Sequence, residues 1–244
     1  MKIALIQYHI FWEDKSSTKD KIKNLLGQAD LSQVDWLIFP EMSLTGFSMN
    51  PTKTTLEDHD LIFFQELAKK YHAFISFGSV VNQQNVMITL DPQGEVINQY
   101  AKINLFKAAK EDQFYIKGHK LENFLIQDFR ITPFICYDLR FPQIFWSQAF
   151  STDVFVLIAN WPKIRYTHWL TLLKARAIET QAYVIGVNRV GDDPQQKYLG
   201  SSLVISPKGK IVLNCKNSEG VFLADLNLNQ VQLIRKSFPI EFSL

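Results

Sequence analysis

The chain has 244 residues, of which 47% are hydrophobic and 20% charged, and its formal net charge at pH 7 is +2. This composition is typical of globular proteins, and the small net charge gives no electrostatic reason to expect binding to nucleic acid or membrane. No apolar run approaches the roughly 20 residues that span a bilayer. Two widely separated cysteines are no disulfide framework, and no Cys or His pair has zinc-ligand spacing. We therefore expect a cytoplasmic protein without a metal site.

Short apolar runs alternate with helical patterns along the chain. The predicted strands cover residues 2–8, 36–40, 73–81, 86–90, 131–136, 154–160, 183–189, 201–206 and 221–226. The predicted helices cover residues 16–30, 55–72, 142–150 and 166–181. Several strands are apolar at nearly every position, which is typical of strands covered on both faces. In the last helix Trp169, Leu173 and Ala177 recur at i, i+4 and predict one buried stripe.

Two segments share a pattern of strand, turn and strand: ITLDPQGEVI (88–97) and VISPKGKIV (204–212). In both, Pro at the second turn position and Gly at the fourth suit a type I turn, so each segment predicts a hairpin. Each hairpin follows a strand–helix–strand–helix–strand series, and no linker separates the two series. We therefore expect two similar α/β halves in a single domain over residues 1–244. If helices cover one face of each sheet, the bare faces must pack together, which predicts a four-layer α-β-β-α sandwich.

Three residues with chemical potential lie at or just past predicted strands: Glu41, Lys102 and Cys136. Sites in open α/β sheets gather at the carboxyl ends of strands. A thiol must lose its proton to become a nucleophile, and a nearby carboxylate can accept that proton. An ammonium group and the backbone N–H of Tyr137 can stabilise the oxyanion that forms when a thiolate attacks an amide. The three residues together therefore fit a cysteine amidase.

Each of these residues also has an ordinary structural interpretation. A cysteine in an apolar run is usually a core residue. Glu41 could lie near the start of a helix, and Lys102 could be a solvated charge. Cys215, in the polar stretch VLNCKNSEG, is expected to be an exposed thiol without a function.

Three stretches resemble one known family: FPEMSLTGF (39–47), YAKINLF (100–106) and FICYDLRFP (134–142). The family is the nitrilase, or carbon–nitrogen hydrolase, superfamily, and the resemblance extends over nearly the whole chain. Members share the four-layer sandwich and need no metal or organic cofactor, so none is expected here.

The resemblance implies a role for each matching residue. Glu41 is expected to be the general base, Lys102 to contribute to the oxyanion hole, and Cys136 to form a thioester intermediate. The family also uses a second glutamate after the lysine, which positions the substrate or holds the lysine. Glu111 matches that position, although the adjacent Asp112 is an alternative and either residue could be a surface charge.

Residues 160–193 resemble the omega-amidase branch, in particular its bacterial members. These enzymes hydrolyse the terminal amide of 2-oxo acids such as 2-oxoglutaramate and 2-oxosuccinamate, and release ammonia. FICYDLRFP is also similar to the deaminated-glutathione amidases. The expected partners are a small amide substrate and, because the family commonly forms homodimers, a second copy of the chain. Residues 234–244 are expected to form a surface tail or to reach across such an interface.

A 2-oxo acid amide carries a carboxylate away from the reacting bond, and the planar fork of an arginine suits that group best. Arg165 is the first candidate for this contact. Arg140 is another, although it could instead pair with Asp138. Arg189 is a third, although it could pair with an aspartate of the following GDD sequence.

Aromatic residues near these strand ends are candidate pocket walls. Phe47 and Trp161 are expected to line the pocket beside Tyr137, although aromatic residues after strands are often core. His168 begins a predicted helix, and we expect it to cap or pack there rather than to act as a base.

Three other functions compete with an omega-amidase. The same fold and residues could cleave deaminated glutathione, a carbamoyl amino acid, a simple amide or a nitrile. A non-catalytic binding module is disfavoured because all three motif residues are present. A thiol redox protein is disfavoured because the chain lacks a CxxC motif.

Overall fold

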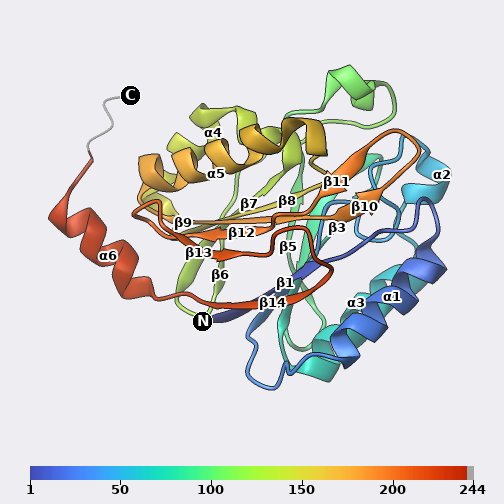
Figure 1. Ribbon diagram of the computed structural model, residues 1–244, viewed down its shortest axis with the longest axis horizontal. Coiled ribbons are helices and arrows are strands. Elements are labelled where there is room, and N and C mark those ends of the chain that lie inside the picture. The colour runs from blue at the N-terminus through green and yellow to red at the C-terminus, as the bar shows by residue number, and fades with distance from the viewer. Residues whose placement is uncertain (241–244) are drawn as a thin grey trace.

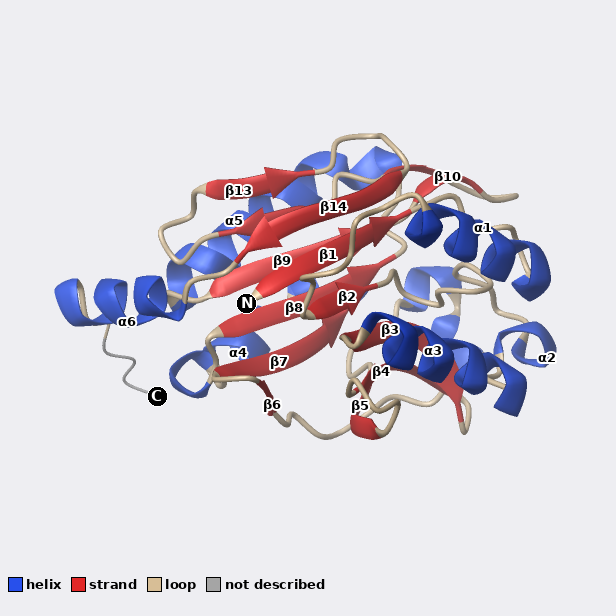
Figure 2. Cartoon of the chain, turned by 90° about the horizontal axis from the view of Figure 1, so that it is seen from below, coloured by secondary structure: helices blue, strands red, loops and turns tan. Residues whose placement is uncertain are grey.

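The computed structural model describes residues 1–240 and folds the chain into two six-stranded sheets packed face to face (Figures 1 and 2). The strand orders are β14-β1-β2-β3-β4-β5 and β13-β12-β9-β8-β7-β6. The first sheet contains β1 (Lys2–Gln7), β2 (Trp36–Ile38), β3 (Phe74–Val81), β4 (Gln84–Leu90), β5 (Val96–Ala101) and β14 (Gly220–Asp225). The second contains β6 (Phe124–Ile126), β7 (Phe129–Ile135), β8 (Val154–Ala159), β9 (Tyr183–Asn188), β12 (Leu203–Ile205) and β13 (Ile211–Asn214).

Helices cover the outer face of each sheet. The α-helices are α1 (Lys15–Gly27), α2 (Pro51–Thr54), α3 (Asp58–Tyr71), α4 (Pro142–Trp146), α5 (Tyr166–Thr180) and α6 (Leu228–Ser237). Helices α1 and α3 pack on the first sheet, and α4 and α5 pack on the second (Figures 1 and 2). The predicted four-layer α-β-β-α sandwich is confirmed.

The alternation of side chains along a strand explains why these strands are apolar on both faces. Ile3 and Leu5 of β1 belong to the core between the sheets, whereas Ala4 and Ile6 belong to the core under α1 and α3. All four side chains are fully buried. Successive residues of a strand point to opposite faces, so a strand in the middle of this sandwich needs two apolar faces.

The two halves have the same topology, and each one completes the sheet of the other. Strands β1-β2-β3-β4-β5 and β7-β8-β9-β12-β13 each form two parallel pairs followed by two antiparallel pairs. Strand β6, which follows the first half, pairs with β7 of the second sheet. Strand β14, which follows the second half, pairs with β1 of the first sheet. The two halves therefore share their sheet edges. A single domain over residues 1–244 stays a prediction.

Both predicted hairpins are present. The carbonyl of Asp91 accepts a hydrogen bond from Gly94 N–H at 2.9 Å, and that of Ser206 accepts one from Gly209 N–H at 2.8 Å. The first turn joins β4 to β5 and the second joins β12 to β13. The Pro-x-Gly pattern therefore located both turns.

Other elements were missed or misplaced. The missed elements are β6, α2, α6 and a two-stranded hairpin of β10 (Val190–Asp192) and β11 (Lys197–Leu199). The helix predicted over 142–150 ends at Trp146. The helix predicted from residue 55 begins at Asp58, and Glu57 is its N-cap residue. Helix α6 has one buried residue, Val231, so its apolar signal is weak. The end of the predicted tail, residues 241–244, lies outside the described residues.

The stripe on α5 is confirmed, because Trp169, Leu173 and Ala177 are all buried. The interpretation of Cys215 as an exposed thiol is wrong: its side chain is buried in the hydrophobic core, and its N–H donates to the carbonyl of Ser202. Within residues 1–240, no helix is long and apolar enough to cross a bilayer.

The contact of α5 with the second sheet requires Gly186. A Cβ at this position would lie 2.6 Å from Leu173 Cδ1 and 2.7 Å from Trp169 Cζ2. G186A is therefore expected to lower the free energy of unfolding by about 1–3 kcal/mol, because the packed core has no space for a methyl group. Urea unfolding followed by tryptophan fluorescence measures this loss. G27A is the control, since a Cβ there meets no atom within 4 Å. Equal stability of both variants would contradict the prediction.

Candidate active site

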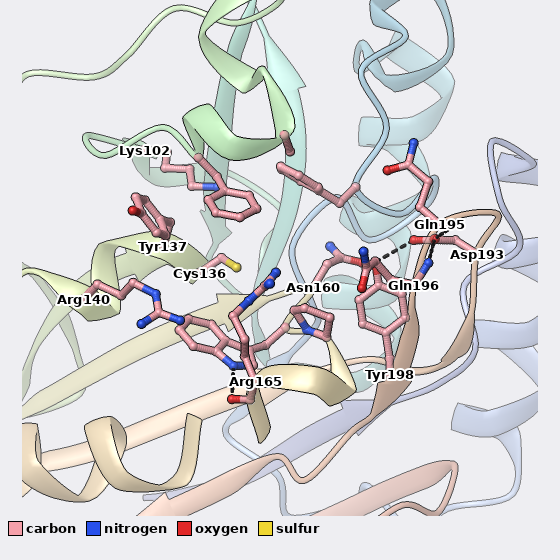
Figure 3. A pocket seen from close by; sticks show the side chains of 15 residues that line it. Lys102, Cys136, Tyr137, Arg140, Asn160, Arg165, Asp193, Gln195, Gln196 and Tyr198 are labelled. Carbon is pink, nitrogen blue, oxygen red and sulfur yellow. Dashed lines mark hydrogen bonds between the residues drawn. The ribbon is translucent and has the colours of Figure 1, made fainter. Parts of the chain in front are cut away.

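A pocket of about 70 Å³ lies at the carboxyl ends of β7 and β8. Its lining includes Cys136 directly after β7, Asn160 directly after β8, and Lys102 directly after β5. Figure 3 shows the sulfur of Cys136 in the open space between the side chains of Lys102 and Arg165. The pocket has room for a small molecule, and both halves of the chain contribute to it.

The Lys102 ammonium group is bound by two buried carboxylates. Its Nζ lies 3.0 Å from Glu41 Oε1 and 3.0 Å from both carboxylate oxygens of Glu111. All three side chains have no exposure to solvent. Asp112, the alternative to Glu111, is exposed. The structure therefore brings three of the four predicted catalytic residues into one ion cluster.

Further hydrogen bonds hold the carboxylates in place. Asn85 Nδ2 donates to Oε1 of Glu41 at 2.8 Å and of Glu111 at 2.9 Å. The backbone N–H of Asn160 donates to Glu41 Oε2 at 2.8 Å, and its Nδ2 donates to the Glu41 carbonyl at 2.7 Å. The N–H of Phe106 donates to Glu111 Oε2 at 2.6 Å. Sequence reasoning missed Asn85 and Asn160, although Asn160 begins the NWP stretch at a strand end.

The backbone around Glu41 depends on a glycine in the neighbouring strand β3. A Cβ on Gly78 would lie 2.4 Å from the nitrogen of Met42 and 2.7 Å from Cα of Glu41. The hydroxyl of Ser43 also accepts a hydrogen bond from Gly78 N–H at 2.9 Å. Only glycine allows this approach without displacing the Glu41 turn.

Cys136 lies in a sharp turn between β7 and a 3₁₀ helix that spans Cys136–Arg140, and its φ of 44° is in the left-handed region. Asp138 fixes this turn by accepting hydrogen bonds from Ile135 N–H, the Tyr100 hydroxyl and the Asn104 side chain. The suggested pair of Arg140 with Asp138 is wrong, because these three donors occupy that carboxylate. The turn presents the thiol at the rim of the sheet.

The charges of the cluster keep the resting thiol protonated. Two carboxylates and one ammonium group carry a net charge of −1. Burial raises the pKa of the Cys136 thiol well above its usual value, and the charge of Glu41 raises it further, while Lys102 partly opposes both. Burial would lower the pKa of Lys102, but Glu111 and Glu41 outweigh burial and raise it. A proton that moves from Cys136 to Glu41 leaves the net charge of the site unchanged, so that transfer avoids a doubly negative pocket.

Two of the three predicted arginines line the pocket, namely Arg140 and Arg165. Neither forms an ion pair with any residue among 1–240. The Arg140 guanidinium lies 4.9 Å from the Trp161 ring centre, and that of Arg165 lies 5.3 Å from the Phe106 ring centre. Arg189 is fully buried outside the lining, and its Nη1 lies 4.0 Å from Asp193 Oδ2. Arg189 therefore has a structural position. Its pairing with an aspartate of the GDD sequence was the alternative predicted for it.

The predicted aromatic walls are present. Phe47, Tyr137 and Trp161 line the pocket, and the Phe47 ring centre lies 5.0 Å from Lys102 Nζ. His168 is outside the lining, and its Nδ1 lies 3.1 Å from Arg140 Nη2. One wall was missed: the β10–β11 hairpin contributes side chains from Asp193, Gln195, Gln196 and Tyr198. Its sequence, GDDPQQKY, is polar. It lacks the alternation of apolar and polar residues from which strands are predicted.

One acidic group outside the pocket has the spacing of metal ligands. Glu57, His59 and Asp60 place one ligand atom each within 4.8 Å of the others. Asp60 already binds Lys15 at 2.6 Å and Lys19 at 2.7 Å. These lysines neutralise the carboxylate that a cation would need, so this group is an ion-pair network.

Besides burial, the charge of Glu41 raises the pKa of the Cys136 thiol in the free protein and so lowers its reactivity. E41Q removes that charge with little change of shape, so we expect the pKa of Cys136 to fall. Because the thiolate is the reactive form, alkylation by iodoacetamide at about pH 8 should become roughly tenfold faster per unit of pKa. Mass spectrometry of the Cys136 peptide over a pH series measures this rate. E122Q, at an exposed position, is the control; an E41Q profile that is unchanged or moved to higher pH would contradict the prediction.

Comparisons with known proteins agree with the geometry. "Hydrolase in agr operon" of Staphylococcus aureus is 34% identical over 98% of this chain and 96% of that protein. Omega-amidase YafV of Escherichia coli K12 is 34% identical over 98% and 94%, and 2-oxoglutaramate amidase of Bacillus subtilis is 30% identical over 98% and 95%.

Solved structures show the same fold. A CN-hydrolase superfamily protein of Xanthomonas campestris, which carries an arsenic adduct in its active site, has a TM-score of 0.92 at 29% identity and covers 100% of this chain and 98% of that one. Residues 2–236 match the family described as Carbon-nitrogen hydrolase. The chain belongs to this family of hydrolases, the nitrilase superfamily.

Proposed function

We propose that the protein is an omega-amidase, which hydrolyses the terminal amide of small 2-oxo acid omega-amides such as 2-oxoglutaramate and 2-oxosuccinamate. The products are the 2-oxo diacid and ammonia. One observation carries the proposal: Cys136 opens into a pocket with an ion cluster at one side and two arginines without carboxylate partners among residues 1–240 at the other. Relatives named omega-amidase and 2-oxoglutaramate amidase support this choice of substrate.

The first half of the reaction forms a thioester. Cys136 gives its proton to Glu41, and its sulfur attacks the amide carbonyl carbon. Lys102 Nζ and the N–H of Tyr137 stabilise the negative charge on the oxygen. Glu41 then protonates the leaving nitrogen, the C–N bond breaks, and ammonia departs.

The second half regenerates the thiol. Water gives a proton to Glu41 and attacks the thioester carbonyl at the same oxyanion site. The C–S bond breaks, the 2-oxo diacid leaves, and the sulfur recovers a proton from Glu41. Glu111 holds Lys102 through both halves of the reaction, because both of its carboxylate oxygens bind Nζ.

The charges that line the pocket favour a 2-oxo acid over an amino acid. Arg140, Arg165 and Lys102 are cationic lining groups. The lining carboxylate, Asp193, already accepts hydrogen bonds from two backbone N–H groups and from the Tyr198 hydroxyl. A substrate carboxylate therefore finds two guanidinium groups, whereas an α-ammonium group finds no free acceptor carboxylate in this lining.

Ammonia release from a panel of amides tests the proposal. We expect 2-oxoglutaramate and 2-oxosuccinamate to exceed glutamine, deaminated glutathione, a carbamoyl amino acid and a simple amide by roughly tenfold or more in kcat/KM. C136A should be inactive, since the thioester cannot form. A different best amide would contradict the substrate assignment and leave the cysteine amidase. An active C136A would contradict the mechanism, and no turnover of any amide would favour a binding module.

The arginines are expected to act on the carboxylate of the substrate. R165A should raise KM for 2-oxoglutaramate by roughly tenfold or more with a smaller change in kcat, because a charge-assisted hydrogen bond is lost. A simple amide without a carboxylate should react at the same rate with R165A and with the unmodified protein. R140A is tested in parallel, and K163A, at an exposed neighbouring position, is the control. An equal loss on both substrates would show a structural role instead.

Two expectations from the family resemblance stay predictions: the homodimer and the cytoplasmic location.

A further inference from the structure

Asn85, in strand β4, is a polar residue with no exposure to solvent. Its Nδ2 group donates to carboxylate oxygens of both Glu41 and Glu111, at 2.8 and 2.9 Å. Its Oδ1 is buried and has no hydrogen-bond partner among residues 1–240. A buried carbonyl oxygen without a partner costs free energy, so the favourable contribution of this side chain comes from its two N–H donors.

The backbone of Asn85 contacts the third member of the cluster. Its carbonyl accepts a hydrogen bond from Lys102 N–H at 2.8 Å. Asn85 thus contacts the main chain of the lysine and both carboxylates that bind the lysine Nζ. The other donors reach one carboxylate each: Asn160 binds Glu41, and Phe106 N–H binds Glu111.

The two carboxylates repel each other, and the ammonium group compensates one of their two negative charges. A neutral donor that binds both can hold them apart at fixed positions without adding charge. An aspartate in place of Asn85 would offer acceptors and a third negative charge. A leucine would offer no donor and would remove the unpartnered oxygen.

We infer that Asn85 is a positioning residue that holds Glu41 and Glu111 around Lys102, and so keeps Glu41 in place to receive the proton of Cys136. The inference rests on the proposed function for the role of Glu41. Asn85 is outside the pocket lining, so it acts through the glutamates and affects the chemical step more than substrate binding.

Kinetics of N85L and N85D test this role. N85L should lower kcat by about 100-fold, as expected for a misplaced catalytic group, and should change KM by less than about threefold. N85D should lose activity as the pH rises, because its carboxyl group can donate one hydrogen bond only while it is protonated. The alkaline limb of its kcat profile should therefore lie at lower pH than that of the unmodified protein.

N98D is the matched control. Asn98 lies in the adjacent strand β5 and also has a buried Oδ1 without a partner among residues 1–240. N98D adds the same charge to the same sheet outside the cluster, and its kcat profile should not move. Thermal unfolding of all variants shows whether they are folded. Retention of kcat within about threefold in N85L, or equal shifts in N85D and N98D, would overturn the inference.

A readout without substrate separates this inference from the proposed function. N85D adds negative charge near Cys136, so alkylation of Cys136 by iodoacetamide should slow at alkaline pH, while N98D should leave it unchanged. If the unmodified protein hydrolyses no amide of the panel but N85D still slows alkylation, the substrate proposal fails and Asn85 keeps its assignment. If N85D changes neither alkylation nor the kcat profile, the inference about Asn85 fails whatever the substrate is.

Discussion

Burial of the Lys102 ammonium group between Glu41 and Glu111 is the interaction on which the rest of the site depends. Removal of charged groups from water costs several kcal/mol for each ion, and loss of one partner of a buried pair costs about 3–5 kcal/mol. The fold offsets this cost with donors from separate segments, namely Asn85, Phe106 and Asn160. The ion cluster therefore joins strand ends of both halves. The Cys136 thiol lies where this cluster borders the pocket.

The layers and the main site residues were predictable because their signals are local. Strands with two apolar faces and Pro-x-Gly turns have patterns that can be counted in the sequence, and Glu41, Lys102 and Cys136 lie at or just past the predicted strands. The resemblance to the nitrilase superfamily is confirmed by the family match over residues 2–236. The catalytic roles of the site residues stay predictions until activity is measured.

The parts that were missed depend on contacts between distant segments. Asn85 is one polar residue inside a strand, and its importance appears only when Glu41 and Glu111 meet beside it. Asp138 is two positions from Arg140, and a pair between them was one of the alternatives that the sequence left open. Instead Asn104, 34 positions away in sequence, occupies that carboxylate. Cys215 precedes a polar stretch, yet its side chain is buried at the edge of the second sheet.

The exchange of edge strands has a consequence for the synthesis of the chain on the ribosome. The first half emerges before β14, which covers the open edge of β1. An unpaired edge is a template for pairing with other chains, and pairing between such distant residues is slow. The nascent first half therefore exposes this edge until the last strand has been made. The thiol meets its base only when the second half docks on the first, so a chain in which only one half has folded cannot perform the proposed hydrolysis.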